Sequence, residues 1–201
     1  MGKTYWQNLP YTFGPVALLE YDELVRQGPC RDAQEDFILK NSGIDTKLLD
    51  VGCNTGALAW RLGKKGYQGA YVGVDSNDRS VQAAQGNFTG ANQVSFEVSA
   101  AEKMNFEPES FDIVLSKDVI EHVENYGPIL QEMARVSKDV IILSMFIRMW
   151  DEPDLISPHP DGYFLNRYNR QRLYRFMALV GFPQVEIIFQ EKDDEVLVFR
   201  K

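Results

Sequence analysis

The chain has 201 residues, of which 44% are hydrophobic and 25% charged, as expected for a globular protein with one full-sized core. The formal net charge of −8 argues against an extended nucleic-acid surface, because such a surface needs a basic stripe that replaces counterions. The longest apolar run, 140–147, is too short to span a bilayer, and the first ten residues lack the apolar core of a signal peptide. We therefore expect a cytoplasmic protein without a membrane or nucleic-acid partner, and the sequence leaves its oligomeric state open.

The N-terminal 45 residues have a pattern of their own. Helical patterns cover 16–26 and 31–41, and four aromatic residues lie between positions 5 and 13. We expect residues 1–45 to form a helical and aromatic cap, either a lid over a ligand cleft or a strap on the sheet. Residues 46–201 are predicted to form the ligand-binding domain, and the chain is expected to be a single domain overall.

Strand and helix patterns alternate from residue 46 onward. Strand-like runs cover 46–52, 70–76, 93–99, 111–116, 139–146, 184–190 and 194–201. Helix-like runs cover 57–66, 77–88, 126–137 and 169–181. This alternation predicts an α/β fold with a doubly wound, seven-stranded, mostly parallel sheet. The last two strands are too close for a helical crossover, so one of them is expected to be antiparallel in a terminal hairpin.

The first chemical signal is a glycine turn after the first predicted strand. It reads Asp50-Val-Gly52-Cys-Asn54-Thr-Gly56. Gly52 permits a sharp exit from the strand, and Gly56 permits close approach of the backbone to a ligand. The glycine spacing differs from the dinucleotide fingerprint, and an acid two residues before the first glycine would repel a pyrophosphate. The turn therefore suits a ligand that carries an amino group or a sulfonium.

The second signal is Asp75, at the end of the second predicted strand. An acid at this strand tip is placed to accept hydrogen bonds from two ribose hydroxyls. The alternative is that Asp75 caps the following helix, although Asn77 or Asp78 is better placed near that N-terminus. The pairing of Asp75 with the glycine turn favours the ribose role.

Three segments resemble the class I S-adenosylmethionine-dependent methyltransferases. They are residues 48–59, 71–77 and 99–123. The resemblance implies a Rossmann-like methyltransferase fold, with S-adenosylmethionine as the methyl donor.

The resemblance also implies a set of cofactor-binding residues. They are Asp50, Gly52, Cys53, Asn54, Gly56, Asp75, Ser76, Ala101, Glu102, Ser116 and Lys117. The glycine turn would line the methionine part of the donor, and Asp75 would hold the ribose. Ala101 and Glu102 would lie beside the adenine ring. Ser116 and Lys117 would lie beneath the sulfonium, at the end of the fourth strand.

Two positions depart from the family pattern. Asn54 replaces the commoner glycine of the turn, which is a mild change because Asn tolerates left-handed backbone angles. Ala100 stands where many members carry an Asp that bonds the adenine amino group. Adenine recognition is thereby left to backbone groups or to Glu102. Cys53 lies inside the turn, where a small side chain is needed, and its expected role is packing.

Asp118 and His122 are the candidate catalytic residues. A histidine near the methyl donor can remove a proton from a hydroxyl or amine acceptor. The alternative is a partly buried histidine that ties its helix to the active-site loop. Asp118, Glu121 and His122 also resemble the acid–acid–His cluster of metal-dependent members, with His159 as a fourth ligand. We do not favour a divalent metal over a capping acid, a surface glutamate and a loop histidine.

Arginine and aromatic residues alternate between 162 and 176 in an otherwise acidic chain. Arginine suits carboxylate or phosphate recognition, so this segment predicts an anion-binding rim. The alternative is an amphipathic helix with buried aromatics and solvated arginines. Arg167 and Tyr168 precede the helical pattern and are the expected substrate contacts.

These signals predict methyl transfer from S-adenosylmethionine to oxygen or nitrogen of a small-molecule or saccharide-like acceptor. An RNA or protein methyltransferase is one alternative, and it would need a basic face formed in space by the arginines. A nicotinamide oxidoreductase is disfavoured by the glycine spacing and by Asp50. A non-catalytic S-adenosylmethionine-binding module would keep the same cofactor residues, and only turnover separates it from an enzyme.

Overall fold

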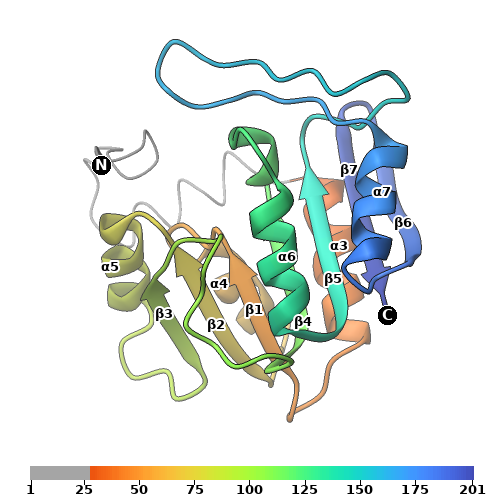
Figure 1. Ribbon diagram of the computed structural model, residues 1–201. Coiled ribbons are helices and arrows are strands. Elements are labelled where there is room, and N and C mark those ends of the chain that lie inside the picture. Colours follow the sequence, from red (N-terminus) through yellow and green to blue (C-terminus); the bar gives the residue numbers. More distant parts are fainter. Residues whose placement is uncertain (1–27) are drawn as a thin grey trace.

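The order of the strands brings the two predicted motifs side by side. A computed structural model describes residues 28–201, and its seven-stranded sheet has the order β3-β2-β1-β4-β5-β7-β6 (Figure 1). The strands are β1 (Lys47–Val51), β2 (Ala70–Asp75), β3 (Val94–Val98), β4 (Phe111–Lys117), β5 (Ser137–Met145), β6 (Gln184–Glu191) and β7 (Asp194–Arg200). β1 pairs in parallel with both β2 and β4, so the carboxyl ends of these strands meet at one edge.

The terminal hairpin lies at the other end of the sheet. β7 runs antiparallel to both of its neighbours, β5 and β6. The predicted fold class, a mostly parallel doubly wound sheet with an antiparallel terminal strand, is therefore confirmed. The helix expected at 16–26 and the aromatic residues between 5 and 13 lie outside the described residues. The role of residues 1–45 as a cap stays a prediction.

Helices cover both faces of the sheet. They are α3 (Pro29–Lys40), α4 (Ala57–Lys64), α5 (Asp78–Asn87), the 3₁₀ helix η1 (Ile120–His122), α6 (Gly127–Val136) and α7 (Arg170–Leu179). α3, α4 and α5 pack on one face of the sheet, where they contribute Ile38, Leu62 and Val81 to one buried cluster. α6 and α7 pack on the opposite face, where they contribute Leu130 and Leu173 to a second cluster. No helix within residues 28–201 has the length and apolar character needed to cross a membrane.

The central strand β1 is buried on both faces. Leu48 joins the cluster beneath α3, α4 and α5, whereas Leu49 joins the cluster beneath α6 and α7, because successive strand residues point to opposite faces. Asp50 interrupts this apolar run with a carboxylate that is itself buried. A buried carboxylate needs polar partners, so Asp50 marks the point where the core gives way to a site.

Asparagine side chains cap two of the helices. The Asn77 side-chain oxygen accepts from the backbone N–H of Arg79 at 3.0 Å and of Ser80 at 3.3 Å, which fixes the start of α5. This confirms one of the two caps that the sequence offered. Asn169 caps α7 in the same way, by accepting from Arg172 N at 2.8 Å.

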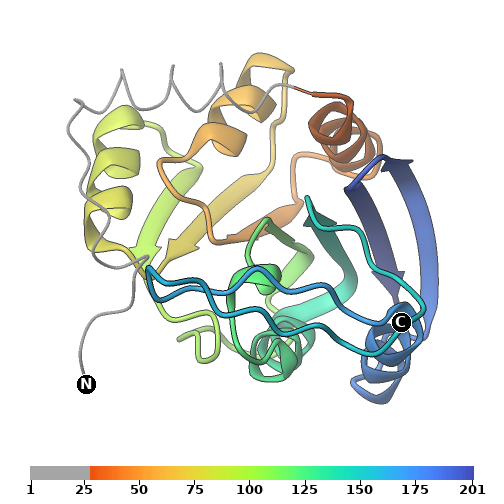
Figure 2. The same ribbon diagram turned by 90° about the horizontal axis from the view of Figure 1, so that it is seen from above.

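Residues 146–169 connect β5 to α7 and form what we call the arm. Leu155 bridges Arg167 and Pro158 bridges Phe164 in antiparallel fashion, so the arm folds back on itself. It lies across the edge formed by the carboxyl ends of the strands (Figures 1 and 2). The sequence analysis assigned to its second half an arginine-rich pattern and the candidate metal ligand His159.

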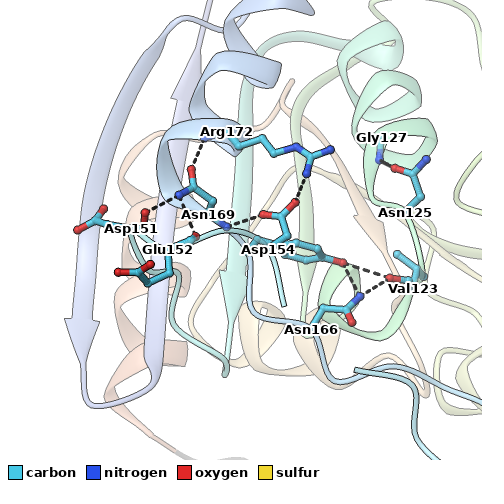
Figure 3. Close-up of polar contacts among 10 residues, drawn as sticks. Val123, Asn125, Gly127, Asp151, Glu152, Asp154, Asn166, Asn169 and Arg172 are labelled. Atoms are coloured by element: carbon cyan, nitrogen blue, oxygen red, sulfur yellow. Dashed lines mark hydrogen bonds and ion pairs between the residues drawn. The ribbon is translucent and has the colours of Figure 1, made fainter. Parts of the chain in front are cut away.

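Two asparagines hold the base of the arm (Figure 3). The Asn169 amide donates to the backbone oxygens of Asp151 and Glu152, both at 2.9 Å. The fully buried Asn166 amide donates to Val123 O at 2.6 Å, in the segment that follows η1. The arm is therefore fastened to the same segment that carries His122.

Candidate active site

The glycine turn has three residues with left-handed backbone angles. The φ angles are 85° at Gly52, 49° at Asn54 and 84° at Gly56. A Cβ added at Gly52 would lie 2.4 Å from a methyl carbon of Val119, so only glycine fits there. The N–H groups of Gly52 and Cys53 donate to the Val74 carbonyl at 2.8 and 3.0 Å. The turn is thus tied to β2 as soon as it leaves β1.

The second glycine of the turn has a packing role. A Cβ added at Gly56 would lie 2.8 Å from the Phe96 ring and 3.0 Å from the Phe88 ring. The space beside Gly56 is therefore filled by aromatic rings, and its contact with a ligand stays a prediction. Cys53 is buried, and a Cβ on Gly73 would lie 2.8 Å from its Sγ. Burial raises the pKa of the Cys53 thiol well above its usual value, in keeping with a packing role.

Asp75 joins the two motifs. Its Oδ2 accepts from Asn54 N and its Oδ1 from Asn77 N, each at 2.9 Å. Burial raises the pKa of this carboxyl, and the backbone N–H groups oppose the rise. A carboxylate offers about four acceptor sites, so capacity remains for a ligand hydroxyl. The side chain of Asn77, and not that of Asp75, caps α5.

A narrow cleft of about 50 Å³ opens between the glycine turn, the end of β4 and α3. Five of the residues implied by the family resemblance line it: Asp50, Gly52, Cys53, Asn54 and Lys117. Six further residues that the sequence analysis did not name also line it: Arg31, Gln34, Glu35, Ala57, Leu58 and Leu115. The available signal was the spacing of 31, 34 and 35, which places three polar side chains on one face of a helix.

Buried polar groups line this cleft or support its walls. The Tyr71 hydroxyl donates to Asp50 Oδ2 and holds the carboxylate in place. Burial, followed by the charge of Asp50, raises the pKa of Tyr71 well above its usual value, so the hydroxyl stays a donor. Gln34 is buried, and its Oε1 has no donor among residues 28–201. An unpaired buried acceptor costs about 1 to 3 kcal/mol, which a ligand N–H would relieve.

Unlike its neighbour Gln34, Glu35 forms ion pairs with residues at the end of another helix. Its carboxylate accepts from Arg61 Nε and lies 3.0 Å from Lys65 Nζ. These ion pairs fasten α3 to α4. They hold Gln34 at the wall of the cleft.

The end of β4 presents a charged pair beside a buried hydroxyl. Lys117 Nζ lies 2.6 Å from Asp118 Oδ2. Asp118 has a left-handed φ of 54°, which is costly for a residue other than glycine and marks a backbone forced into place. Its N–H donates to Ser144 O at 2.8 Å. Ser116 is buried, and its Oγ has no hydrogen-bond partner in the described part of the chain.

The imidazole of His122 is oriented by the arm. Its Nδ1 lies 2.9 Å from Phe164 O. A carbonyl only accepts, so Nδ1 carries the proton of the neutral ring and Nε2 carries the lone pair. In this tautomer Nε2 is the atom that can receive a proton. The centroid of the His122 ring lies 5.3 Å from that of Phe146 and 5.8 Å from that of Tyr163.

Glu121 is buried, contrary to the surface glutamate of the sequence analysis. Burial, together with the charge of Asp118, raises the pKa of Glu121 to about 8. Its Oε1 accepts from Phe146 N at 3.2 Å, at the start of the arm. The side chain is therefore largely protonated at neutral pH.

The side chains proposed as metal ligands do not gather. His159 lies in the arm, stacked on Tyr163 with ring centroids 4.2 Å apart, and its Nδ1 lies 3.5 Å from Asp161. Across residues 28–201, no group of three or more His, Cys, Asp or Glu side chains is arranged to hold a metal ion.

The predicted adenine contacts differ in exposure. Ala101 is half-buried against the core, whereas Glu102 is exposed. Ser99 N donates to Asp75 O at 3.0 Å, which places this segment at the tip of β2 next to the half-buried Ser76. The contacts of these residues with a ligand stay predictions.

The arginine-rich segment does not form the expected rim. Tyr168 is buried, and its hydroxyl donates to Ile120 O at 2.7 Å, so the predicted substrate contact is wrong. Arg170 pairs with the buried Glu195, its Nη2 lying 3.2 Å from Oε2. The aromatic side was predicted correctly as core, but this arginine is fixed in an internal ion pair. Arg167 lines a cavity between the arm and the β6–β7 turn.

A family model described as a methyltransferase domain matches residues 43–156, more than half of the chain. The chain belongs to this family. The matched range contains the glycine turn, Asp75 and the segment from Ser116 to His122. The prediction of a class I S-adenosylmethionine-dependent methyltransferase domain is thereby confirmed.

Curated relatives share the methyltransferase domain at low identity. The ubiquinone biosynthesis O-methyltransferase of Bartonella quintana (strain Toulouse) is 27% identical over 150 residues, which are 72% of this chain and 60% of that protein. The ajmaline N-methyltransferase of Rauvolfia serpentina is 35% identical over 103 residues, which are 48% of this chain and 35% of that protein. The chain thus spans at most about three fifths of the length of these two relatives.

Solved structures share the fold of this methyltransferase domain. An S-adenosylmethionine-dependent methyltransferase of Methanosarcina mazei has a TM-score of 0.66 at 18% identity, covering 82% of this chain and 96% of that one. The magnesium protoporphyrin IX methyltransferase of Synechocystis PCC 6803, solved with bound S-adenosylmethionine, has a TM-score of 0.65 at 16% identity. It covers 98% of this chain and 88% of that one.

Proposed function

We propose that this chain transfers a methyl group from S-adenosylmethionine to an oxygen or nitrogen atom of a small-molecule acceptor. The observation that carries the proposal is the bond from Asn54 N to Asp75 Oδ2, 2.9 Å long, beside the cleft that contains Asp50. It fixes two carboxylates on neighbouring strands, one for an amino group and one for a ribose. The proposal keeps the cytoplasmic location expected from the sequence.

The polar groups of the cleft fit the methionine part of the donor. Asp50 and the unpaired Gln34 Oε1 are acceptors, which suit the amino group of the methionine part. Arg31 lines the same cleft and suits the carboxylate of that part. Asp75 has acceptor capacity left for ribose hydroxyls. The amino and carboxylate groups of the methionine part therefore each have a partner of opposite charge on this chain.

When bound, S-adenosylmethionine supplies a methyl group on a positively charged sulfonium. The chain contributes mainly alignment, through the glycine turn and the rigid end of β4. Because Lys117 is paired with Asp118, this end of β4 presents neither a lone cation nor a lone acid. Such balance suits a group whose positive charge disappears during transfer.

We assign the acceptor's proton to His122. Its Nδ1–H is held by Phe164 O, so Nε2 is the atom that takes the proton. Asp118 is the second proposed catalytic residue, because its negative charge is felt at the adjacent Glu121 and favours the imidazolium that forms. The buried Glu121 itself is assigned a positioning role at the root of the arm.

The arm supports a small acceptor. It covers the carboxyl edge of the sheet, where an RNA or protein chain would need open space (Figure 2). The arginines at 167, 170 and 172 each lie beside an acid of this chain, so they do not form the basic face that RNA binding needs. Relatives named for O- and N-methyl transfer support the choice of atom. A saccharide-like acceptor remains the alternative within this class.

Calorimetric titration with S-adenosylhomocysteine tests the first half of the proposal, and turnover with methyl-labelled donor tests the second. We expect saturable binding and labelled product from a panel of hydroxyl- and amine-bearing small molecules. Binding without turnover on any acceptor class would favour the non-catalytic module. Label in RNA or protein alone would replace the small acceptor by a polymer. Absence of binding would overturn the proposal.

A further inference from the structure

A second cavity lies between the end of β5, the arm and the β6–β7 turn. We call it the distal pocket. Its volume is about 330 Å³, which is inside the range of about 300 to 1,000 Å³ typical of small-molecule sites. Its walls are apolar and aromatic: Phe146, Ile147, Trp150, Leu155 and Leu165. Arg167 and Asp193 complete the lining.

The distal pocket has one cation among its apolar walls. The Arg167 guanidinium lies 5.4 Å from the centre of the Trp150 ring, in a cation–π contact. Its carboxylate partner is Asp193, at 3.4 Å, and that side chain is 72% exposed. An ion pair of this length with an exposed partner is weak, so a ligand anion can take the place of Asp193.

The distal pocket offers two kinds of contact to a bound molecule. The rings of Phe146 and Trp150 suit a flat apolar body, and the Arg167 guanidinium suits anionic oxygens. The chemistry of this pocket therefore favours a flat apolar body with anionic oxygens.

The distal pocket adjoins the proposed reaction centre. Phe146 lines the pocket, and its ring centroid lies 5.3 Å from that of His122. The backbone N–H of Phe146 also donates to Glu121 Oε1, which ties the backbone of this residue to η1. A molecule that reaches His122 with its reacting hydroxyl or amine can thus place its other end on the far side of Phe146.

We propose that the distal pocket binds the end of the methyl acceptor remote from the reacting atom, and that this end is an aromatic ring carrying a carboxylate. Arg167 pairs with the carboxylate in place of Asp193, and the ring packs against Phe146 and Trp150. The inference rests on the proposed function. It narrows the acceptor class, because a cationic acceptor is repelled by Arg167 and an uncharged saccharide has no charge that could pair with Arg167.

Two probes that differ only in charge test this inference. We would titrate 4-hydroxybenzoate and 4-hydroxybenzamide into the full chain by calorimetry, at low ionic strength and with S-adenosylhomocysteine present. The benzoate is expected to bind about tenfold more tightly than the amide. Arg167→Gln is expected to abolish this preference. Asp193→Asn is expected to strengthen benzoate binding, because it removes the competing carboxylate.

The matched control is Arg172→Gln. Arg172 belongs to the same segment, and its Nη1 pairs with Asp154 at 2.6 Å outside the distal pocket. It should leave the preference for benzoate intact. Equal binding of the two probes, or a preference that survives Arg167→Gln, overturns the inference while S-adenosylhomocysteine binding leaves the proposed function standing. If S-adenosylhomocysteine itself fails to bind, both fail together.

Discussion

Replacement of Asp75 by alanine tests the joint between the two motifs most directly. The variant loses the acceptor of Asn54 N and Asn77 N, and with it the proposed partner of the ribose hydroxyls. Hydrogen bonds to a charged group contribute about 1.5 to 3 kcal/mol each. Asp75 is half-buried, so water would replace part of these hydrogen bonds in the variant. We therefore expect a net loss of about 1.4 to 3 kcal/mol of binding free energy. That loss corresponds to about 10- to 100-fold weaker binding of S-adenosylhomocysteine.

Calorimetry measures this change, and a melting curve shows whether the variant is folded. Asp78→Ala is the matched control. It also removes one negative charge near the start of α5, but it leaves the bonds from Asn54 N and Asn77 N to Asp75 in place. The pH dependence adds a second readout. The ribose hydroxyls donate to the ionised carboxylate, and burial raises the pKa of Asp75. Wild-type affinity should therefore fall as acid protonates this group, whereas the alanine variant should lack that change. A folded Asp75→Ala protein with wild-type affinity would refute the ribose assignment.

Three further substitutions address the base, the buried acid and the turn. His122→Ala should spare S-adenosylhomocysteine binding but lower turnover about 100-fold or more, whereas His159→Ala should not; equal turnover would make His122 structural. Glu121 has a pKa of about 8, above its unfolded value near 4.5, so the wild type should lose stability as pH rises through this interval. Glu121→Gln cannot ionise, and its melting temperature should fall less over the same range; parallel curves would contradict the raised pKa. Gly52→Ala should cost about 2 to 5 kcal/mol of unfolding free energy from backbone strain and the clash with Val119. Gly90 has a similar φ of 83°, but a Cβ added there would have no neighbour within 4 Å, so Gly90→Ala should cost less unfolding free energy. Equal losses in the two variants would show that the contact with Val119 does not contribute.

The sheet and the cofactor edge follow from local sequence patterns. Buried runs such as 48–51 exist because both sides of a parallel strand face helices. The ends of β1 and β2 meet because adjacent parallel strands finish at one edge, so Asp50 and Asp75 were predictable as neighbours. Their position depends on strand order, which alternation of strands and helices already restricts.

Other parts of the site depend on packing that no local pattern encodes. Gln34 reaches the cleft because ion pairs between α3 and α4 fix the rotation of α3. Tyr168 looked like a surface contact because arginines flank it, yet its hydroxyl finds backbone acceptors next to η1. The arm has no periodicity, since bridges, caps and single side-chain anchors shape it.

The anchoring of the arm limits how an acceptor enters. Asn166 and Tyr168 fasten its returning half to the backbone beside η1, so the arm has no hinge at its root. The anchoring extends to Phe164, whose N–H donates to His122 O at 3.3 Å and whose carbonyl holds His122 Nδ1. A displacement of this part of the arm would therefore also release the imidazole, so substitutions near Phe164 should change the orientation of His122 together with the shape of the arm.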